Sequence, residues 1–172
     1  MKKLAIIPLL LALCLTLNGC FFMVSTPPPS PFDPEDLGAP KTFEKVGITL
    51  QLTDKFSDTK SKLEFDAYYT SDYCGVVVMK EPFTLEQGLA ELPLDEYIKN
   101  VIENNGHTNI EPQKRDGLWY YINYNNSSYR CVFSYVYKGT DSFYIVQYII
   151  NTVDEDTLKE TIHDWAKATL VS

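Results

Sequence analysis

Histidine is scarce in this chain, which has only His107 and His163 among its 172 residues. Neither of the two lies at the spacing from another histidine or from a cysteine that zinc sites use. Beyond residue 20 the sequence also has no recognisable catalytic or nucleotide-binding motif. We therefore predict no metal site and no cofactor.

Positive charge is also in short supply, because 15 lysines and arginines stand against 23 acidic residues, for a formal net charge of −8. An acidic surface repels both nucleic acid and anionic lipid. The charge therefore excludes nucleic acid as an expected partner. It is compatible with cationic partners, although acidity often serves only solubility.

No apolar run in the chain is long enough to cross a bilayer. The longest, Leu4 to Leu17, has about 14 residues, whereas a spanning helix needs about 20. Lys2 and Lys3 precede this run, and the small residue Gly19 follows it. A basic start, a short apolar core and a small residue before the cut are typical of an export signal. The sequence thus predicts a signal peptide over residues 1–19.

Cysteine is limited to four residues, and Cys14 lies within the predicted signal. The segment Leu17-Asn18-Gly19-Cys20 resembles the lipobox of bacterial lipoproteins. The resemblance implies a diacylglycerol on Cys20 and cleavage just before it. Two acyl chains are enough for stable anchoring. We expect an extracytoplasmic protein on the outer leaflet of the plasma membrane, or on the outer membrane of a diderm. The alternative is a plain secretory signal.

The remaining cysteines, Cys74 and Cys131, lie in predicted strands. An exported protein meets an oxidising compartment, where disulfides persist. Two interpretations stay open, namely a disulfide between the two residues or a pair of buried free thiols.

Proline is concentrated in one stretch, Ser25 to Pro34. Consecutive prolines favour an extended polyproline II chain over packed structure. We therefore predict a spacer over residues 20–40 that holds the domain away from the lipid surface. A ligand for a proline-recognition module is the alternative. Residues 41–172 have the length of one domain.

The periodicity of apolar residues predicts the elements of this domain. Alternation of apolar and polar residues predicts strands at Phe43–Leu52, Leu63–Tyr69, Cys74–Met79, Thr108–Lys114, Leu118–Tyr124, Tyr129–Tyr137 and Ser142–Ile150. Helical spacing predicts a helix ending at Asn104-Asn105-Gly106, a second helix at Asp154–Leu170 with a capping box of Thr152 and Glu155, and a short helical turn within Thr84–Leu92. Polar turns such as Asp116-Gly117 join successive strands as hairpins. Hairpins pair antiparallel, so we predict an α+β domain with a central antiparallel β-sheet covered by helices.

The order of these elements resembles the PsbP-like superfamily. The resemblance rests on the central helix, the tyrosine-rich strands, the C-terminal helix with Trp165, and the opening strand Phe43-x-x-Val46-Gly47-Ile48-Thr49-Leu50-x-Leu52. It covers about Phe43 to Leu170. It implies a three-layer sandwich that is used mainly to bind other proteins, and it supplies no catalytic residues.

Aromatic residues are abundant, with twelve tyrosines in the chain. Nine aromatic side chains lie in three successive strands: Trp119, Tyr120, Tyr121, Tyr124, Tyr129, Tyr135, Tyr137, Tyr144 and Tyr148. Alternation sends them to both faces of the sheet. One hypothesis is a binding face of Trp119, Tyr121, Tyr135 and Tyr137, because tyrosine and tryptophan are favoured at interfaces. The alternative is ordinary cross-strand packing.

The function that these features favour is a non-catalytic binding or accessory module, anchored by lipid outside the cytoplasm, with a protein or an envelope polymer as its partner. One alternative is an envelope enzyme in which Glu103 or Asp116 acts near His107. Another is a solute-binding lipoprotein. A deep pocket with a perturbed acid or histidine would favour the enzyme.

Overall fold

The structure, a computed structural model, describes residues 32–61, 65–107 and 109–172. The helices described are α2 (Leu94–Asn104), α3 (Glu155–Lys167) and the short 3-10 helices η1 (Pro34–Asp36), η2 (Phe83–Leu85) and η3 (Thr152–Asp154). The strands described are β1 (Pro40–Lys45), β2 (Ile48–Thr53), β3 (Ser57–Asp58), β4 (Ala67–Thr70), β5 (Cys74–Pro82), β6 (Gln113–Arg115), β7 (Leu118–Asn125), β8 (Arg130–Lys138), β9 (Ser142–Asn151) and β10 (Leu170–Val171).

The strands form two antiparallel sheets. A large sheet has the order β3-β4-β5-β9-β8-β7-β6, and a small sheet has the order β1-β2-β10. The central strand β9 is rich in aromatic and β-branched residues, and nearly all of its side chains are buried. Such a composition suits a strand that is covered on both faces.

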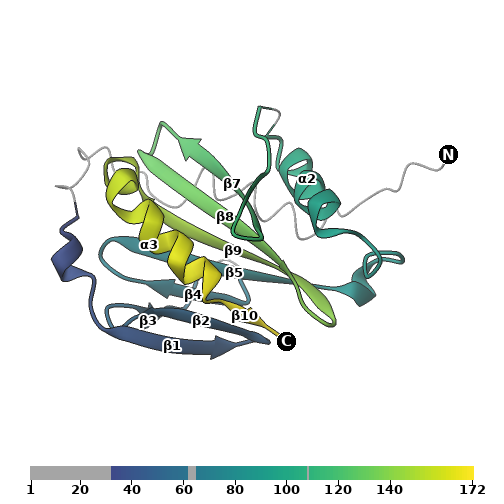
Figure 1. Ribbon diagram of the computed structural model, residues 1–172, viewed down its shortest axis with the longest axis horizontal. Helices are drawn as coiled ribbons and strands as arrows, with labels where there is room; N and C mark the ends of the chain where they lie inside the picture. Colours follow the sequence, from purple (N-terminus) through teal and green to yellow (C-terminus); the bar gives the residue numbers. More distant parts are fainter. Residues whose placement is uncertain (1–31, 62–64, 108) are drawn as a thin grey trace.

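Two hydrophobic cores lie on opposite faces of the large sheet. One core lies between the large sheet and a layer formed by α3 with the small sheet. Figure 1 shows α3 crossing the large sheet, with β1, β2 and β10 beside it. The other core lies beneath α2, which packs on β7 and β8. The prediction of an α+β domain with a central antiparallel sheet covered by helices is confirmed.

The predicted opening strand at Phe43–Leu52 is wrong, because the chain turns back within it. Val46 and Gly47 have φ values of +50° and +89° and join β1 to β2 as a tight hairpin. Gly47 supports such a backbone, but a valine at a positive φ is unusual. The β-branched Val46 therefore conceals the turn in the sequence. By contrast, the predicted turn at Asp116-Gly117, with φ values of +50° and +86°, is confirmed.

The predicted C-terminal helix is too long at both ends. Asp154, the N-cap of α3, uses its carboxylate to hold the backbone N–H of Phe32, and no side chain forms the predicted capping box. The helix ends at Lys167, and Leu170–Val171 pairs with β2 as strand β10. The predicted strand at Thr108–Lys114 contracts to β6, which follows Pro112.

The last part of the predicted spacer belongs to the packed domain. Phe32 packs on Tyr73 with 4.3 Å between ring centroids, and the Tyr73 hydroxyl donates to the carbonyl of Leu37. Both Phe32 and Leu37 contact the core beneath α3. The packed domain therefore begins by residue 32, earlier than residue 41. The predicted signal peptide, Cys20 and the stretch up to residue 31 lie outside the described residues.

Candidate functional site

The predicted aromatic binding face is wrong, because the fold covers both sides of the sheet. Tyr135 and Tyr137 lie beneath α3, where the Tyr137 hydroxyl donates to the carbonyl of Ala166. Tyr121 is buried on the opposite side, near α2, and Trp119 is half-buried there. Tyr135 is 1% exposed, so it cannot meet a partner. The four side chains stabilise the two cores, which was the alternative interpretation.

Cys74 and Cys131 are buried free thiols, so no disulfide joins them in the structure. Both residues pair with Ile150, from the two sides of β9. Strands two positions apart in a sheet are separated by about 10 Å, whereas the α-carbons of a disulfide lie within about 7 Å. The bond would therefore require movement of the backbone.

His163 is the centre of a hydrogen-bonded group that sequence reasoning missed. Its Nδ1 lies 3.2 Å from the Tyr135 hydroxyl, and its Nε2 lies 3.3 Å from Asp116 Oδ2. This hydrogen bond, followed by the charge of Lys167, lowers the pKa of Asp116 below its ordinary value. A bidentate pair of Arg115 with Glu160 lies beside it. No sequence spacing links Asp116 to His163, because the turn and the helix meet only in the folded chain.

This group holds the β6–β7 turn on α3. Burial raises the pKa of Tyr135, and that hydroxyl is enclosed. His107, the base of the alternative enzyme hypothesis, lies elsewhere, half-buried with its ring centroid 6.0 Å from that of Tyr121. Burial lowers the pKa of His107. Asp116 is thus hydrogen-bonded to His163 instead of His107. The structure does not favour the pair of Asp116 with His107 that the enzyme hypothesis predicts.

Glu81 is a buried acid on the face of the large sheet that α2 covers. The Tyr97 hydroxyl donates to its Oε2 at 2.7 Å, while its Oε1 is buried and finds no hydrogen-bond partner in the described part of the chain. Burial raises the pKa of this carboxyl, and the hydrogen bond from Tyr97 opposes that rise. The Tyr97 ring is stacked on Phe143 at 3.9 Å, which closes the site to solvent. The carboxyl is therefore enclosed in the core beneath α2, with one oxygen bonded to Tyr97.

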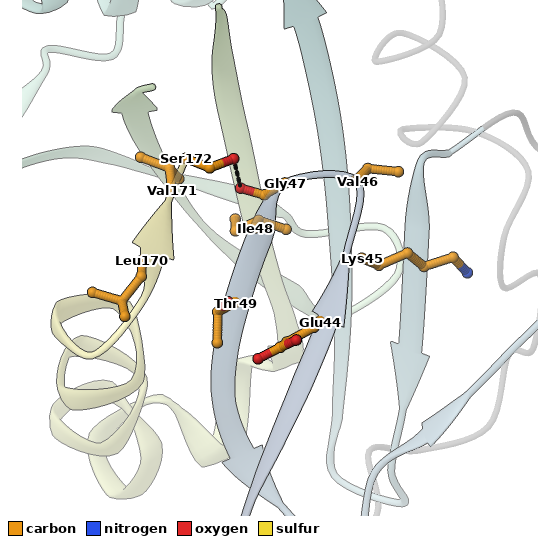
Figure 2. A pocket seen from close by; sticks show the side chains of 9 residues that line it. All are labelled: Glu44, Lys45, Val46, Gly47, Ile48, Thr49, Leu170, Val171 and Ser172. Carbon is orange, nitrogen blue, oxygen red and sulfur yellow. Dashed lines mark hydrogen bonds between the residues drawn. The ribbon is translucent and has the colours of Figure 1, made fainter. Parts of the chain in front are cut away.

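A shallow groove of about 420 Å³ lies on the small sheet. Figure 2 shows it between the β1–β2 hairpin and β10. Its lining is formed by Glu44, Lys45, Val46, Gly47, Ile48, Thr49, Leu170, Val171 and Ser172. Glu44, Thr49 and Leu170 are partners in register across the three strands, so they share one face. Leu170 is 65% exposed, and Val46 is exposed at the hairpin.

Gly47 and Ser172 set the shape of this groove. The backbone N–H and the hydroxyl of Ser172 both donate to the carbonyl of Gly47, as the dashed line in Figure 2 marks for the hydroxyl. A Cβ on Gly47 would lie 2.5 Å from the Tyr144 hydroxyl, which itself donates to the carbonyl of Val46. The groove therefore offers exposed aliphatic side chains with one acid and one lysine. This suits binding and offers no nucleophile–base pair.

The groove was not foreseen, because its parts are remote in the sequence. Val46 and Gly47 were placed inside one strand, and Leu170 was placed at the end of a helix. The one available signal was the glycine that follows Val46, since a glycine inside a strand pattern often marks a bend.

The groove lies away from the point where the chain joins the domain. Phe32 is held by Asp154 at the start of α3, whereas β10 follows the end of that helix. The 13 residues of α3 separate these points by about 20 Å. Figure 1 shows α3 running from the side of η1 toward the C-terminus.

No helix in the described ranges is long and apolar enough to cross a membrane. Residues 32–61, 65–107 and 109–172 contain no group of three or more His, Cys, Asp or Glu side chains that could hold a metal ion.

With a layer of α3 and the small sheet on one face of the large antiparallel sheet and α2 on the other, the fold is of the PsbP-like α+β class. The chain is similar to cyanobacterial PsbP (CyanoP) from Synechocystis sp. PCC 6803, whose solution structure it matches with a TM-score of 0.52. The match covers 85% of this chain and 100% of that chain, at 12% sequence identity. At that identity the likeness shows the fold alone. No family model matches the sequence. No curated protein matches it either.

Proposed function

We propose that the protein is a lipoprotein, anchored outside the cytoplasm through Cys20, that acts as a non-catalytic binding or accessory module. Its partner is a protein or an envelope polymer. The signal pattern of residues 1–19 and the lipobox-like segment before Cys20 support the anchor. The PsbP-like fold, with its buried and enclosed acids and histidine, supports an accessory role over an enzymatic one.

The observation that carries this proposal is the position of the groove. The groove lies where the described chain ends, with Val46 exposed at the hairpin and Leu170 exposed on β10, while Phe32 leads back toward Cys20 from the other end of α3. A partner that approaches from the side away from the membrane would meet this groove without interference from the anchor. Exposed apolar side chains around a concave surface are typical of interaction sites.

Photocrosslinking in native membranes tests the groove. A benzophenone amino acid at Leu170 is expected to give one abundant adduct, and the same group at the exposed Lys99 on α2 is expected to give none. Val46→Asn keeps the turn, because asparagine tolerates a positive φ, but removes the apolar contact. Loss of about 1.5 kcal/mol of apolar burial corresponds to about tenfold weaker binding.

Leu85→Ser is the matched control, because Leu85 is exposed and apolar but does not line the groove. The adduct at residue 170 should fall with Val46→Asn and persist with Leu85→Ser. Equal adducts at residues 170 and 99, or no adduct at residue 170 from a folded probe, would contradict a binding role for the groove.

A further inference from the structure

The position at which the chain joins the domain limits how the domain can lie on a membrane. Phe32 donates its backbone N–H to Asp154 Oδ1 at 2.6 Å and packs on Tyr73. Cys20 precedes Phe32 by 12 residues. A fully extended chain spans at most about 3.6 Å per residue, so Phe32 lies within about 43 Å of an anchored Cys20. The chain from Cys20 enters the described domain at Phe32, so this end is the first part of the domain that the anchor reaches.

Three exposed side chains with large apolar groups lie at this same end. Tyr124, Tyr129 and Val153 are 47%, 53% and 43% exposed. The Tyr129 carbonyl accepts from the Thr152 N–H at 2.9 Å, and the Tyr124 hydroxyl donates to Glu155 Oε1 at 2.6 Å. All three thus lie close to Asp154, the residue that holds Phe32. We call Tyr124, Tyr129 and Val153 the tether-side patch.

The chemistry of the tether-side patch differs from that of the groove. The groove has the aliphatic Val46 and Leu170, whereas two of the three residues of the patch are tyrosines. Tyrosine is favoured at the boundary between lipid and water, because its ring enters the apolar layer while its hydroxyl remains among polar groups.

We propose that the tether-side patch rests on the lipid surface that carries Cys20, which directs the groove away from the membrane. This inference depends on the lipid anchor of the proposed function. A tethered domain needs only a weak contact, because the anchor keeps its local concentration at the surface high. The patch therefore orients the domain without having to recruit it.

The charge around the patch selects the kind of lipid. Asp33, Glu35, Asp36 and Asp156 are exposed near Phe32 and the start of α3. Anionic headgroups within a Debye length of these carboxylates repel them. The surface that fits the patch is thus an uncharged or zwitterionic interface, and anionic lipid weakens the contact.

Fluorescence quenching in vesicles tests the orientation. The full acylated chain is reconstituted in phosphatidylcholine vesicles that contain a nitroxide-labelled lipid, with an NBD dye on Tyr129→Cys or, as control, on Leu170→Cys. The native thiols Cys74 and Cys131 are buried, so the dye goes to the introduced cysteine. The dye at residue 129 should lose emission to the quencher while the dye at residue 170 keeps it. Equal quenching at the two positions, or none at either, overturns the proposal.

Two further measurements separate the patch from fold and anchor. Tyr124→Ser with Val153→Ser should reduce quenching at residue 129 in a protein whose circular dichroism is unchanged, and phosphatidylglycerol in the vesicles should reduce it too. Undiminished quenching in either case contradicts the patch.

The mass of the N-terminal peptide reports acylation of Cys20 in the same sample. If acylation is absent, the proposed function fails. The patch is then tested with a hexahistidine tag in place of residues 1–19, Cys20→Ser, and a nickel-chelating lipid, and the same difference between residues 129 and 170 decides it.

Discussion

His163 joins two elements through both nitrogens of its ring. Asp116 carries an ionised carboxylate that can only accept a hydrogen bond, so Nε2 of a neutral His163 donates to it. Nδ1 is then left to accept from the Tyr135 hydroxyl. The ring thereby connects the β6–β7 turn to the interior of β8, and one tautomer satisfies all three groups.

The contact of Asp116 with His163 predicts a dependence of stability on pH. The pKa of Asp116 is lowered in the folded state, first by the hydrogen bond of His163 and then by Lys167. Stabilisation is therefore present above the ordinary value of 3.8 and is lost as the pH falls through the lower, folded-state pKa. Asp116→Asn, which tolerates the positive φ, should lower the melting temperature at neutral pH by more than in acid.

A double-mutant cycle with His163→Leu isolates this effect, and thermal unfolding followed by circular dichroism measures it. If Asp116→Asn lowers the melting temperature equally with and without His163, the coupling is refuted.

The two core thiols should be inert in the native protein. Burial raises the pKa of Cys131 to about 12 and raises that of Cys74 as well. The thiolate is the reactive form, so both residues should resist alkylation. In mature protein with Cys20→Ser, iodoacetamide should leave both thiols unmodified at pH 8 and modify both after unfolding in guanidinium without reductant. Recovery of a disulfide after unfolding would reverse this conclusion.

The two tight hairpins form a matched pair of elements. Gly47 and Gly117 have φ values of +89° and +86° and follow residues at +50°. A Cβ on Gly47 would meet the Tyr144 hydroxyl at 2.5 Å, whereas a Cβ on Gly117 has no neighbour within 4 Å. Both alanine substitutions cost about 1 kcal/mol of backbone strain. Gly47→Ala should cost about 1–3 kcal/mol more, because it overpacks a closed contact.

Urea unfolding of the two variants measures this difference in the free energy of unfolding. If Gly47→Ala and Gly117→Ala lower the free energy of unfolding equally, the contact of Tyr144 with the hairpin does not add to the cost of the substitution.

Sequence patterns reported elements well where turn chemistry and periodicity agreed. Asp116-Gly117 predicted its hairpin because both residues accept a positive φ, and the apolar stripe of α2 fixed that helix to its last turn. The hairpin at Val46-Gly47 was not predicted, because valine is a strand residue by preference. Strand β10 was not predicted either, because its two residues acquire their extended conformation by pairing with β2, and no local sequence pattern encodes that contact.

For the whole molecule, hairpin order was enough to give the fold class but not the site. The binding-face hypothesis grouped Tyr135 with Tyr121, whereas the strand register places them on opposite faces of the large sheet, one beneath α3 and the other near α2. The groove arises from residues about 120 positions apart, so its position depends on tertiary packing.

The lipid anchor is a property of the whole molecule that fractionation can test. Cys20→Ser removes the acceptor of the diacylglycerol and should move the protein from the membrane fraction to the soluble extracytoplasmic fraction, because no other acyl chain holds it. The variant Cys14→Ser should remain with the membrane. Retention of Cys20→Ser on membranes would argue against the anchor.

The small sheet also has a consequence for the order in which the chain can fold. Ser172 bonds to Gly47 across 125 positions, and β10 pairs with β2. During synthesis from the N-terminus, β2 can pair with β1 early, but it cannot pair with β10 until residues 170 and 171 have been made. Closure of a long loop carries an entropic cost, so we expect β10 to join β2 late in folding. Until then one edge of β2 stays open, and the groove is incomplete.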